Sequence, residues 1–404
     1  MSAVLRLLST KRRVPGRLAR SERLPWALLT ASQLAMFTVG ASGTTRAPFL
    51  RDMAHDLGVS VPMVANLVAA SSVSWGITSI LAGAGSDRWG RRWFLIGGPA
   101  ALAFATIGVA RSESFIGVAA WVTIAGGFCG LFSGVIFNEV SARVAPTRQG
   151  RALGWVMSGQ SLTLLVGVPL AAWVGAYIGW RGVNLCIAGF AVLTALGLLL
   201  TTLRGDDASD AVPSSRMPSL AGALSRPVLR LLSMGIAERI CYGLVAVYYA
   251  TFLQTAYELS LKAVALPLAV FAMGNILGTL LGGLLADRLR DRLTTYAGAM
   301  AASGMVALAL FGWQADLTTS VVLGFAYVFA NAVARPSLMA ALVDVPEQVR
   351  GTVMGLNVTC NSIGWLSAAA LGGWMIGSHG FGGFGPLAAV FATVGAGCAR
   401  VRRG

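Results

Sequence analysis

An acidic side chain interrupts the apolar stretch at residues 228–256. Glu238 lies about ten residues into this stretch, roughly 15 Å along a helix, and Tyr242 follows one turn later on the same face. A carboxylate in apolar surroundings can carry a proton or contact a cation, or it can merely neutralise an arginine, either Arg239 or one on another helix. We therefore consider Glu238 the candidate proton or cation site, with charge neutralisation as the alternative.

A polar stripe runs along the apolar stretch at residues 317–341. Tyr327, Asn331 and Arg335 follow one another at intervals of four residues, so a helix places them on one face. Such a face is expected to point into the interior of a helix bundle. Tyr327 and Asn331 are candidate ligand contacts. Arg335 is either a gate residue or a side chain that reaches the lipid headgroups.

Two further apolar stretches carry candidate cavity residues. Asn357 and Asn361 are four residues apart in one of them, and Gln33 and Phe37 have the same spacing in the other. Amide and aromatic groups offer hydrogen bonds and stacking to an organic ligand, but asparagines join neighbouring helices equally well. Both interpretations remain open for the asparagines.

The sequence lacks the residue clusters of an enzyme or a metalloprotein. Its five cysteines and two histidines are scattered singly, without the spacing of a zinc, redox or disulfide site. It has neither clustered carboxylates nor a Gly-rich phosphate loop that would indicate ATP hydrolysis. We therefore expect no enzymatic activity, no bound metal and no cofactor. Proton coupling is the energy source that stays open.

The elements that position these residues are apolar throughout. Of 404 residues, 56% are hydrophobic and 12% are charged, with a mean hydropathy of +0.71, whereas about a quarter of the residues of soluble domains are charged. A membrane-spanning helix needs about 20 mostly apolar residues. The sequence predicts an all-α membrane protein with twelve such helices, at residues 25–47, 63–85, 93–110, 116–140, 151–176, 182–203, 228–256, 264–286, 294–313, 317–341, 351–377 and 381–399.

The net charge of +15 describes membrane topology rather than nucleic-acid binding. With the start of the chain placed inside, 24 of the 31 Lys and Arg residues fall in the termini and the inside loops, five fall outside, and Arg239 and Arg335 lie within spans. Positive charge is retained in the cytoplasm. We therefore predict a multi-pass protein of the inner (plasma) membrane with both termini cytoplasmic. Its predicted partners are the lipid bilayer and a small molecule, without nucleic acid, and we expect a monomer.

The two halves of the chain repeat each other. Four residues recur at an offset of 200: Gly83, Asp87, Arg88 and Arg92 return as Gly283, Asp287, Arg288 and Arg292. Parallel repeats of this kind place a substrate site between the halves. The predicted organisation is a basic N-terminal segment (1–24), a six-helix bundle (25–203), a cytoplasmic linker (204–227), a second six-helix bundle (228–399) and a tail (400–404).

The loop at residues 83–92 reads GAGSDRWGRR. It resembles the signature loop of the major facilitator superfamily. This resemblance implies a cytoplasmic gate, whose charges pair in the outward-facing state and separate in the inward-facing one. The matching residues are Gly83, Asp87, Arg88, Gly90, Arg91 and Arg92, with a weaker second copy at Asp287 and Arg288. Glu139 is expected to join this gate through Arg88, or else to form a local pair with Arg143.

The stretch at 151–176 carries a predicted bend at Gly167 and Pro169. It resembles the glycine- and proline-containing fifth helix of drug-efflux members of that superfamily, although Ala171 and Ala172 stand where glycines are usual. The fourth helix has Val122 where proton-coupled members carry an arginine, and this puts the usual proton coupling in doubt.

The combined prediction is a secondary transporter that exports a small organic solute, drug-like or a metabolite, by rocking its two halves. Proton antiport through Glu238 is the coupling it suggests. Two alternatives stay open: a metabolite importer of the same superfamily, working as a symporter or uniporter, and a membrane scaffold or sensor that does not transport.

Overall fold

The computed structural model describes residues 24–145, 148–202, 224–289, 291–314 and 316–400. The predicted N-terminal segment, most of the predicted linker and the tail lie outside them. The first half of the chain begins with α1, continues through a 3₁₀ turn η1 and the short helix α2, and then crosses back and forth. Its elements are α1 (Trp26–Thr44), η1 (Ala47–Phe49), α2 (Leu50–Asp56), α3 (Val61–Trp89), α4 (Arg91–Arg111), α5 (Phe115–Arg143), α6 (Gln149–Leu162), the π-helical turn η3 (Thr163–Gly167) and α7 (Val168–Thr202).

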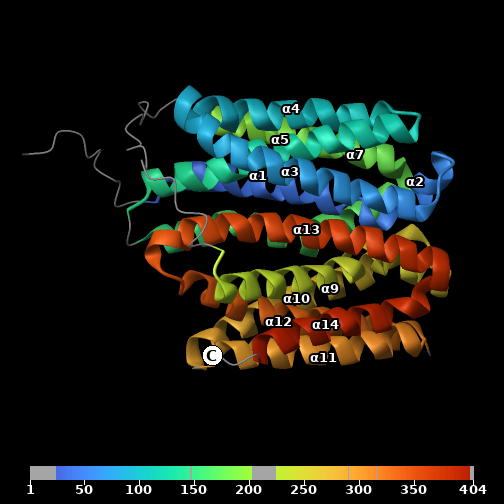
Figure 1. Cartoon of the computed structure of the whole chain (residues 1–404). Helices are drawn as coiled ribbons and strands as arrows, with labels where there is room; N and C mark the ends of the chain where they lie inside the picture. Colours follow the sequence, from blue (N-terminus) through green and yellow to red (C-terminus); the bar gives the residue numbers. More distant parts are fainter. Residues whose placement is uncertain (1–23, 146–147, 203–223, 290, 315, 401–404) are drawn as a thin grey trace, which may run out of the picture.

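The second half repeats this arrangement below the first (Figure 1). Its elements are α9 (Arg226–Ala256), α10 (Leu261–Arg288), α11 (Arg292–Gly312), α12 (Leu317–Val343), α13 (Glu347–His379), η4 (Gly380–Gly383) and α14 (Phe384–Arg400). Polar side chains begin several of these helices: Ser260, Asp291 and Asp316 each accept a hydrogen bond from a backbone N–H of the first turn.

The prediction of twelve spans in an all-α protein is confirmed. Within the described residues, nine helical stretches are long and apolar enough to cross a membrane, and two of these, Gln149–Thr202 and Thr352–Arg400, are 54 and 49 residues long. Each of the two long stretches turns back on itself at a glycine with positive φ, Gly179 or Gly380, and so crosses twice. Together with α1, these make twelve passages. The short helix α2 is an additional element that the apolar pattern does not predict.

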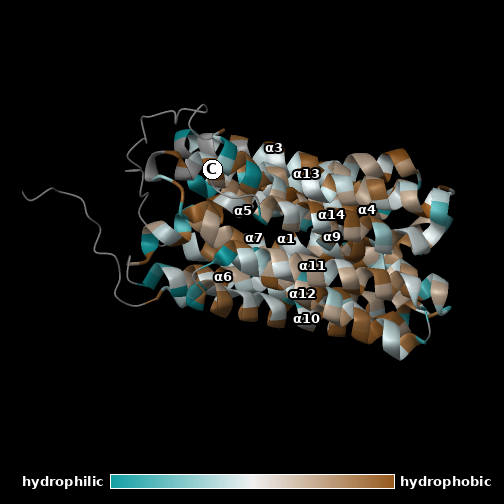
Figure 2. Cartoon of the chain, turned by 60° about the horizontal axis from the view of Figure 1, so that its bottom comes forward, coloured by the Kyte–Doolittle hydropathy of each residue, from teal (hydrophilic) through white to brown (hydrophobic). Residues whose placement is uncertain are grey.

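The exterior of the bundle suits a lipid environment. Large apolar side chains such as Leu200, Leu266 and Leu280 are more than 60% exposed, whereas hydrophilic residues gather at the two ends of the molecule (Figure 2). A soluble monomer rarely exposes apolar surface on this scale. The chain is therefore a multi-pass membrane protein.

Each half is held together by close helix packing at small residues. In the first half, a side chain at Gly126 of α5 would meet the Ser71 backbone of α3 at 2.4 Å. In the second half, a side chain at Gly278 of α10 would meet the Phe329 carbonyl of α12 at 2.3 Å. Glycine lets these backbones approach closely. The second and fourth helices of each half are therefore packed against one another in a matching way.

The bundle has two ends, which we name by their contents. The α2 end carries η1, α2, Gly179 and η4, and the Gly90 end carries the α3–α4 turn at Gly90 and the last residues of α14 (Figure 1). At the α2 end, Asp56 accepts hydrogen bonds from the Trp180 indole at 2.9 Å and the Arg181 guanidinium at 2.8 Å. The indole bond first, and then Arg181, hold the pKa of Asp56 below its ordinary range. These contacts fasten α2 to α7.

Candidate functional site

The buried acid of α9 is paired with its neighbour. Arg239 donates from Nε to one oxygen of Glu238 at 2.7 Å and from Nη2 to the other. Both side chains are buried, at 2% and 5% exposure. Of the two interpretations of Glu238, the structure therefore contains the charge pair, and its partner is the adjacent residue rather than an arginine of another helix.

An aromatic and polar group surrounds this pair. The Arg239 guanidinium lies 4.8 Å from the centre of the Tyr242 ring, and Tyr242 meets Trp365 of α13 edge to face at 5.6 Å. The Tyr242 hydroxyl interacts with Asn275 of α10, and Arg335 of α12 lies within electrostatic range of Tyr242 and of both members of the pair. Four helices of the second half thus meet at this point. We call Glu238, Arg239, Tyr242, Asn275, Arg335 and Trp365 the α9 cluster.

The rest of the predicted α12 stripe lies inside the second half. Tyr327 and Asn331 are fully buried, and the Tyr327 hydroxyl donates to the Cys241 carbonyl at 2.6 Å. The Asn331 amide nitrogen contacts the sulfur of Met300, while its oxygen has no hydrogen-bond partner in the described part of the chain. These two side chains therefore join helices of one half, and only Arg335 continues the stripe to the α9 cluster.

The α13 asparagines differ in their surroundings. Asn357 is buried, its amide nitrogen contacts the sulfur of Met339, and its oxygen has no hydrogen-bond partner among the residues that the structure describes. Asn361 is half-buried, one turn before Trp365. Asn361 therefore lies nearer the α9 cluster along α13 than Asn357 does.

In the first half, α1 packs against the bent fifth passage. Gln33 donates to the Ser158 hydroxyl at 2.8 Å, and Thr163 donates to the Phe37 carbonyl at 2.8 Å. The π-helical turn Thr163–Gly167 ends immediately before Val168 and Pro169, where the bend is predicted. Because π turns often mark functional positions, this contact of α1 with the turn is a candidate moving joint.

Arg46 is a buried cation that sequence reasoning missed. It stands at the edge of the predicted span 25–47 and is one of the five outside charges, but the chain turns into η1 directly after it, and its side chain runs back along α1 to the Ser42 carbonyl. It is 5% exposed, and its Nη1 has no hydrogen-bond partner among the described residues. No periodicity in the sequence reports this inward direction.

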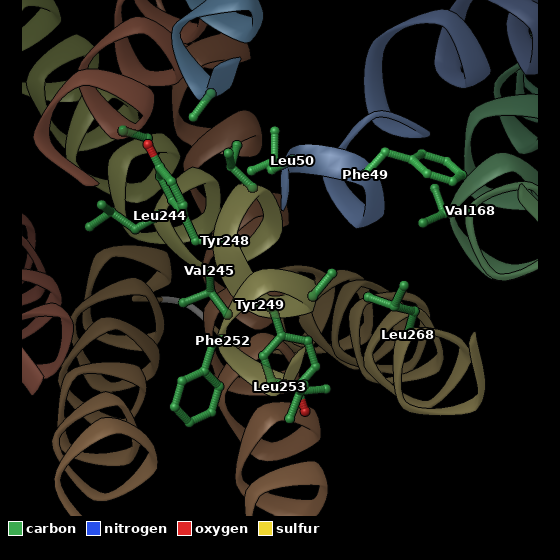
Figure 3. Close-up of a cluster of buried hydrophobic side chains, with 14 of the residues drawn as sticks. Phe49, Leu50, Val168, Leu244, Val245, Tyr248, Tyr249, Phe252, Leu253 and Leu268 are labelled. Carbon is green, nitrogen blue, oxygen red and sulfur yellow. The ribbon is translucent and has the colours of Figure 1, made fainter. Parts of the chain in front are cut away.

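At the α2 end the two halves share one hydrophobic core. This core combines side chains of α1, η1, α2 and α7 with side chains of α9, α10 and α14. Figure 3 shows Phe49 directed toward Val168 of α7, whereas Leu50 lies on the side of Tyr248 of α9. Two hydrogen bonds reinforce the contact: Arg51 donates to the Gln254 carbonyl at 2.9 Å, and Gln254 donates to the Pro48 carbonyl at 3.1 Å.

At the Gly90 end each half has a separate core. One core contains only first-half residues, including Leu102, Phe132 and Val156, and the other contains only second-half residues, including Tyr296 and Leu338. The α9 cluster lies at the boundary, because Tyr242 belongs to the shared core and Cys241 to the separate core of the second half. Apolar packing is therefore shared between the halves on one side of the cluster and separate within each half on the other.

Ion pairs at the Gly90 end also stay within each half. Glu139 of α5 pairs with Arg143 at 2.5 Å and with Arg91 of α4 at 3.8 Å, so the expected bond to Arg88 is absent from the described contacts. In the second half, Arg292 of α11 pairs with Asp344 beyond α12. In each half, the third helix is therefore fastened to the end of the fourth.

The predicted gate loop is only partly described. Gly90 adopts φ 85°, which permits the sharp turn between α3 and α4. Arg88 and Arg92 are exposed, as are Asp287 and Arg288 of the second copy, and the described contacts include no ion pair for them. The surroundings of Gly83 and the Asp87 side chain lie outside the described residues.

Comparison with known proteins identifies the family. The model of the Major Facilitator Superfamily matches residues 34–369, which is most of the chain. The chain belongs to the Major Facilitator Superfamily. It is accordingly a membrane transporter by family, without enzymatic activity or a required cofactor.

Several relatives cover most of the chain. It is 29% identical over 72% of its length to a protein of Pseudomonas aeruginosa named transcription regulatory protein OpdE, covering 73% of that protein. It is 25% identical to a chloramphenicol efflux pump of Mycobacterium tuberculosis, with 86% and 87% of the two chains covered. A purine ribonucleoside efflux pump of Salmonella paratyphi B is 24% identical, with 84% of each chain covered.

A solved structure shares the fold. The inward-facing, occupied form of a bacterial homologue of the human lysosomal transporter Spinster superposes with a TM-score of 0.74 over 94% of both chains, at 17% identity. At this identity the similarity concerns the arrangement of the helices alone.

Proposed function

We propose that this member of the superfamily exports a small organic solute from the cytoplasm by alternating access. The observation that carries the proposal is the single core at the α2 end together with two separate cores at the Gly90 end. A molecule joined at one end and divided at the other is in one of the two states that such a cycle needs. Rocking about the α9 cluster would exchange the joined end for the divided one.

The proposed direction of transport rests on the distribution of Lys and Arg residues and on the names of the relatives. Most of the Lys and Arg residues outside the spans lie in the termini and in the loops at the Gly90 end, which favours this end as the cytoplasmic one. The state with a divided Gly90 end is then inward-facing. Two of the relatives are named efflux pumps, and their naming supports export for this chain.

The gate and the coupling acid are the finer parts of the proposal. Glu139, Arg91 and Arg143 hold the loop at Gly90 against α5. In the other state the exposed Arg88 and Arg92, together with Asp87, would close the cytoplasmic end. Glu238 is the proposed proton site, because protonation of its carboxylate would release the guanidinium of Arg239. In this scheme proton entry and solute exit use the same cluster.

A regulatory role is a second candidate. The relative named as a transcription regulatory protein spans most of this chain, which favours a sensor that retains the transporter fold. Such a protein would tolerate replacement of the gate residues without any change in solute flux. Import of a metabolite remains the alternative for the direction of transport.

The test is efflux of a panel of fluorescent cationic, anionic and neutral compounds from inverted and right-side-out vesicles, with and without a proton gradient. The native chain is compared with Glu238→Gln and Asp87→Ala, and with Arg111→Gln as an exposed control at the α2 end. We expect gradient-driven export by the native chain and the control, and its loss in both site variants. Equal flux in all four proteins would contradict a gated transporter, and gradient-driven uptake would reverse the direction.

A further inference from the structure

Arg335 is the cation of the α9 cluster that has no counterion of its own. It is half-buried and makes no hydrogen bond or ion pair with any described residue. It lies about 12 Å from the end of α12 at the helical rise of 1.5 Å per residue. Along α12, Tyr327 before it bonds to the Cys241 carbonyl and Leu338 after it lies 3.6 Å from a Cβ built at Gly235, so this part of α12 lies against α9 at the level of Arg239. The charge of Arg239 acts on Arg335 and repels it. It is therefore not simply extended toward lipid headgroups.

The nearby carboxylate, Glu238, already has a partner. Both carboxylate oxygens of Glu238 accept hydrogen bonds from Arg239, and the base of the Arg239 side chain packs against α13, because a Cβ added at Gly364 would lie 2.3 Å from the Arg239 Cβ. In this state Glu238 is therefore the counterion of Arg239 and not of Arg335. With one carboxylate and two guanidinium groups, the cluster carries a net charge of +1.

An uncompensated charge at this depth calls for a partner that the described residues do not supply. Arginine within a span is rare and as a rule pairs with an opposite charge or faces a water-filled cavity. The other members of the α9 cluster suit a ligand site: the edge-to-face pair of Tyr242 and Trp365 offers aromatic surface, and Asn275, next to Tyr242, offers an amide. Arg335 also lies where the shared core ends and the halves begin to separate.

We propose that the transported solute is an organic anion, with a carboxylate, phosphate or sulfonate group that binds Arg335 and an apolar or aromatic body that contacts Tyr242 and Trp365. This rests on the proposed transport function and specifies its substrate class. A guanidinium presents planar paired donors that match such oxyanions. The Glu238–Arg239 pair limits the positive charge to one, so a monoanion neutralises the cluster.

The experiment measures binding, so that it is independent of transport. The purified full chain in nanodiscs of neutral phosphatidylcholine is titrated with matched pairs, 2-naphthoate with 2-naphthamide and 3-phenylpropionate with 3-phenylpropanamide, and followed by the shift in melting temperature and by tryptophan fluorescence. We expect at least one acid to bind at least tenfold more tightly than its amide. Arg335→Gln should reduce this preference to within twofold, Arg335→Lys should retain part of it, and Arg111→Gln should leave it unchanged.

Glu238→Gln provides a change of opposite sign. It removes the negative charge of the cluster and should increase the preference for the acid, whereas a merely structural role of the cluster would weaken both ligands together. Equal binding of acid and amide throughout the native panel, or a preference that survives in Arg335→Gln, would overturn the proposal. Loss of the preference when 30% phosphatidylglycerol is added would assign Arg335 to lipid headgroups and also overturn it. Export of only neutral compounds would leave the proposed transport standing and reject the anion.

Discussion

The two ends of the bundle contain the same helices but differ in how the halves meet. At the α2 end, η1 and α2 insert Leu50 and Arg51 against α9, and the apolar side chains of both halves form one core. At the Gly90 end, Glu139 and Asp344 each pair with an arginine of their own half, and the apolar cores are separate. We therefore expect the contacts between the halves to break when the transporter changes state, and the contacts within each half to persist.

Because of this difference, two substitutions that remove the same atoms should have different effects, depending on the core in which they lie. A substitution in the shared core should change the balance between the two states of the transporter, because its contacts exist in one state only. A substitution in a separate core should lower stability in both states alike. The predictions below test this distinction.

The largest effect is expected from a covalent link across the α2 end. A Cβ built at Gly373 of α13 lies 2.9 Å from the Pro62 Cβ of α3, so a small outward shift of the helices would bring the two Cβ atoms to the roughly 3.5–4.5 Å that a disulfide needs. In a chain without its five native cysteines, oxidised Pro62→Cys/Gly373→Cys should reduce transport at least tenfold, with recovery on reduction. Transport that persists in the oxidised protein would mean that the α2 end does not open.

A matched pair of leucines separates state balance from stability. Leu50 and Leu102 are both buried, the first in the shared core and the second in the first-half core. Truncation of a buried leucine to alanine costs about 2–5 kcal/mol. Leu50→Ala should expose the α2 end to impermeant thiol reagents, measured on a cysteine at Gln254. Leu102→Ala should lower the melting temperature without changing this labelling, and the same response in both variants would remove the distinction.

The hydrogen bonds that join the halves at the α2 end, which we call the seam, should contribute less to the conformational balance than Leu50 does. Arg51→Ala removes the donor to the Gln254 carbonyl, and each such bond is worth about 0.5–1.5 kcal/mol. We expect a two- to tenfold shift toward the state open at the α2 end, in the direction of Leu50→Ala and smaller. Arg181→Ala, whose contacts stay within the first half, is the control for loss of an arginine at this end. A larger shift in the control would argue against the seam.

The smallest effect concerns pH. The pKa of Asp56 is lowered in the folded chain by Trp180 and Arg181, so its contribution to stability is complete above the unfolded pKa of about 3.9 and is lost as pH falls through the folded value. Asp56→Asn should therefore melt below the native chain at pH 7, with the difference shrinking below pH 4. The conformational balance should not change, because α2 and α7 belong to one half. A difference that grows in acid would reverse the assigned sign.

The sequence predicts the spans well because each is a long apolar run that a bilayer requires. It does not predict α2, whose seven residues carry charges and no clear period. This omission matters, because Leu50 and Arg51 close one end of the molecule. The separation of the cores also depends on contacts between distant helices, and no local pattern reports it.

The sequence predicts where the candidate site lies, but not which side chains pair within it. Glu238 and Arg335 stand out as charges in apolar stretches, and the α9 cluster contains both. Adjacent residues on a helix point roughly 100° apart, yet the long side chain of Arg239 reaches both oxygens of Glu238. Tyr327 and Asn331 share the periodicity of Arg335, but the Tyr327 hydroxyl is used by the Cys241 carbonyl. Periodicity identifies a face, and only packing reveals what that face contacts.

The most direct test of alternating access is a distance between the halves at the Gly90 end. Spin labels on exposed Arg151 of α6 and on Leu289, directly after α10, report this separation by double electron–electron resonance in nanodiscs. We predict a long distance between the two labels in the resting protein, and a second population with a shorter distance when the acid of the binding panel and a proton gradient are supplied. A single distance that no ligand, gradient or Leu50→Ala substitution changes would contradict it.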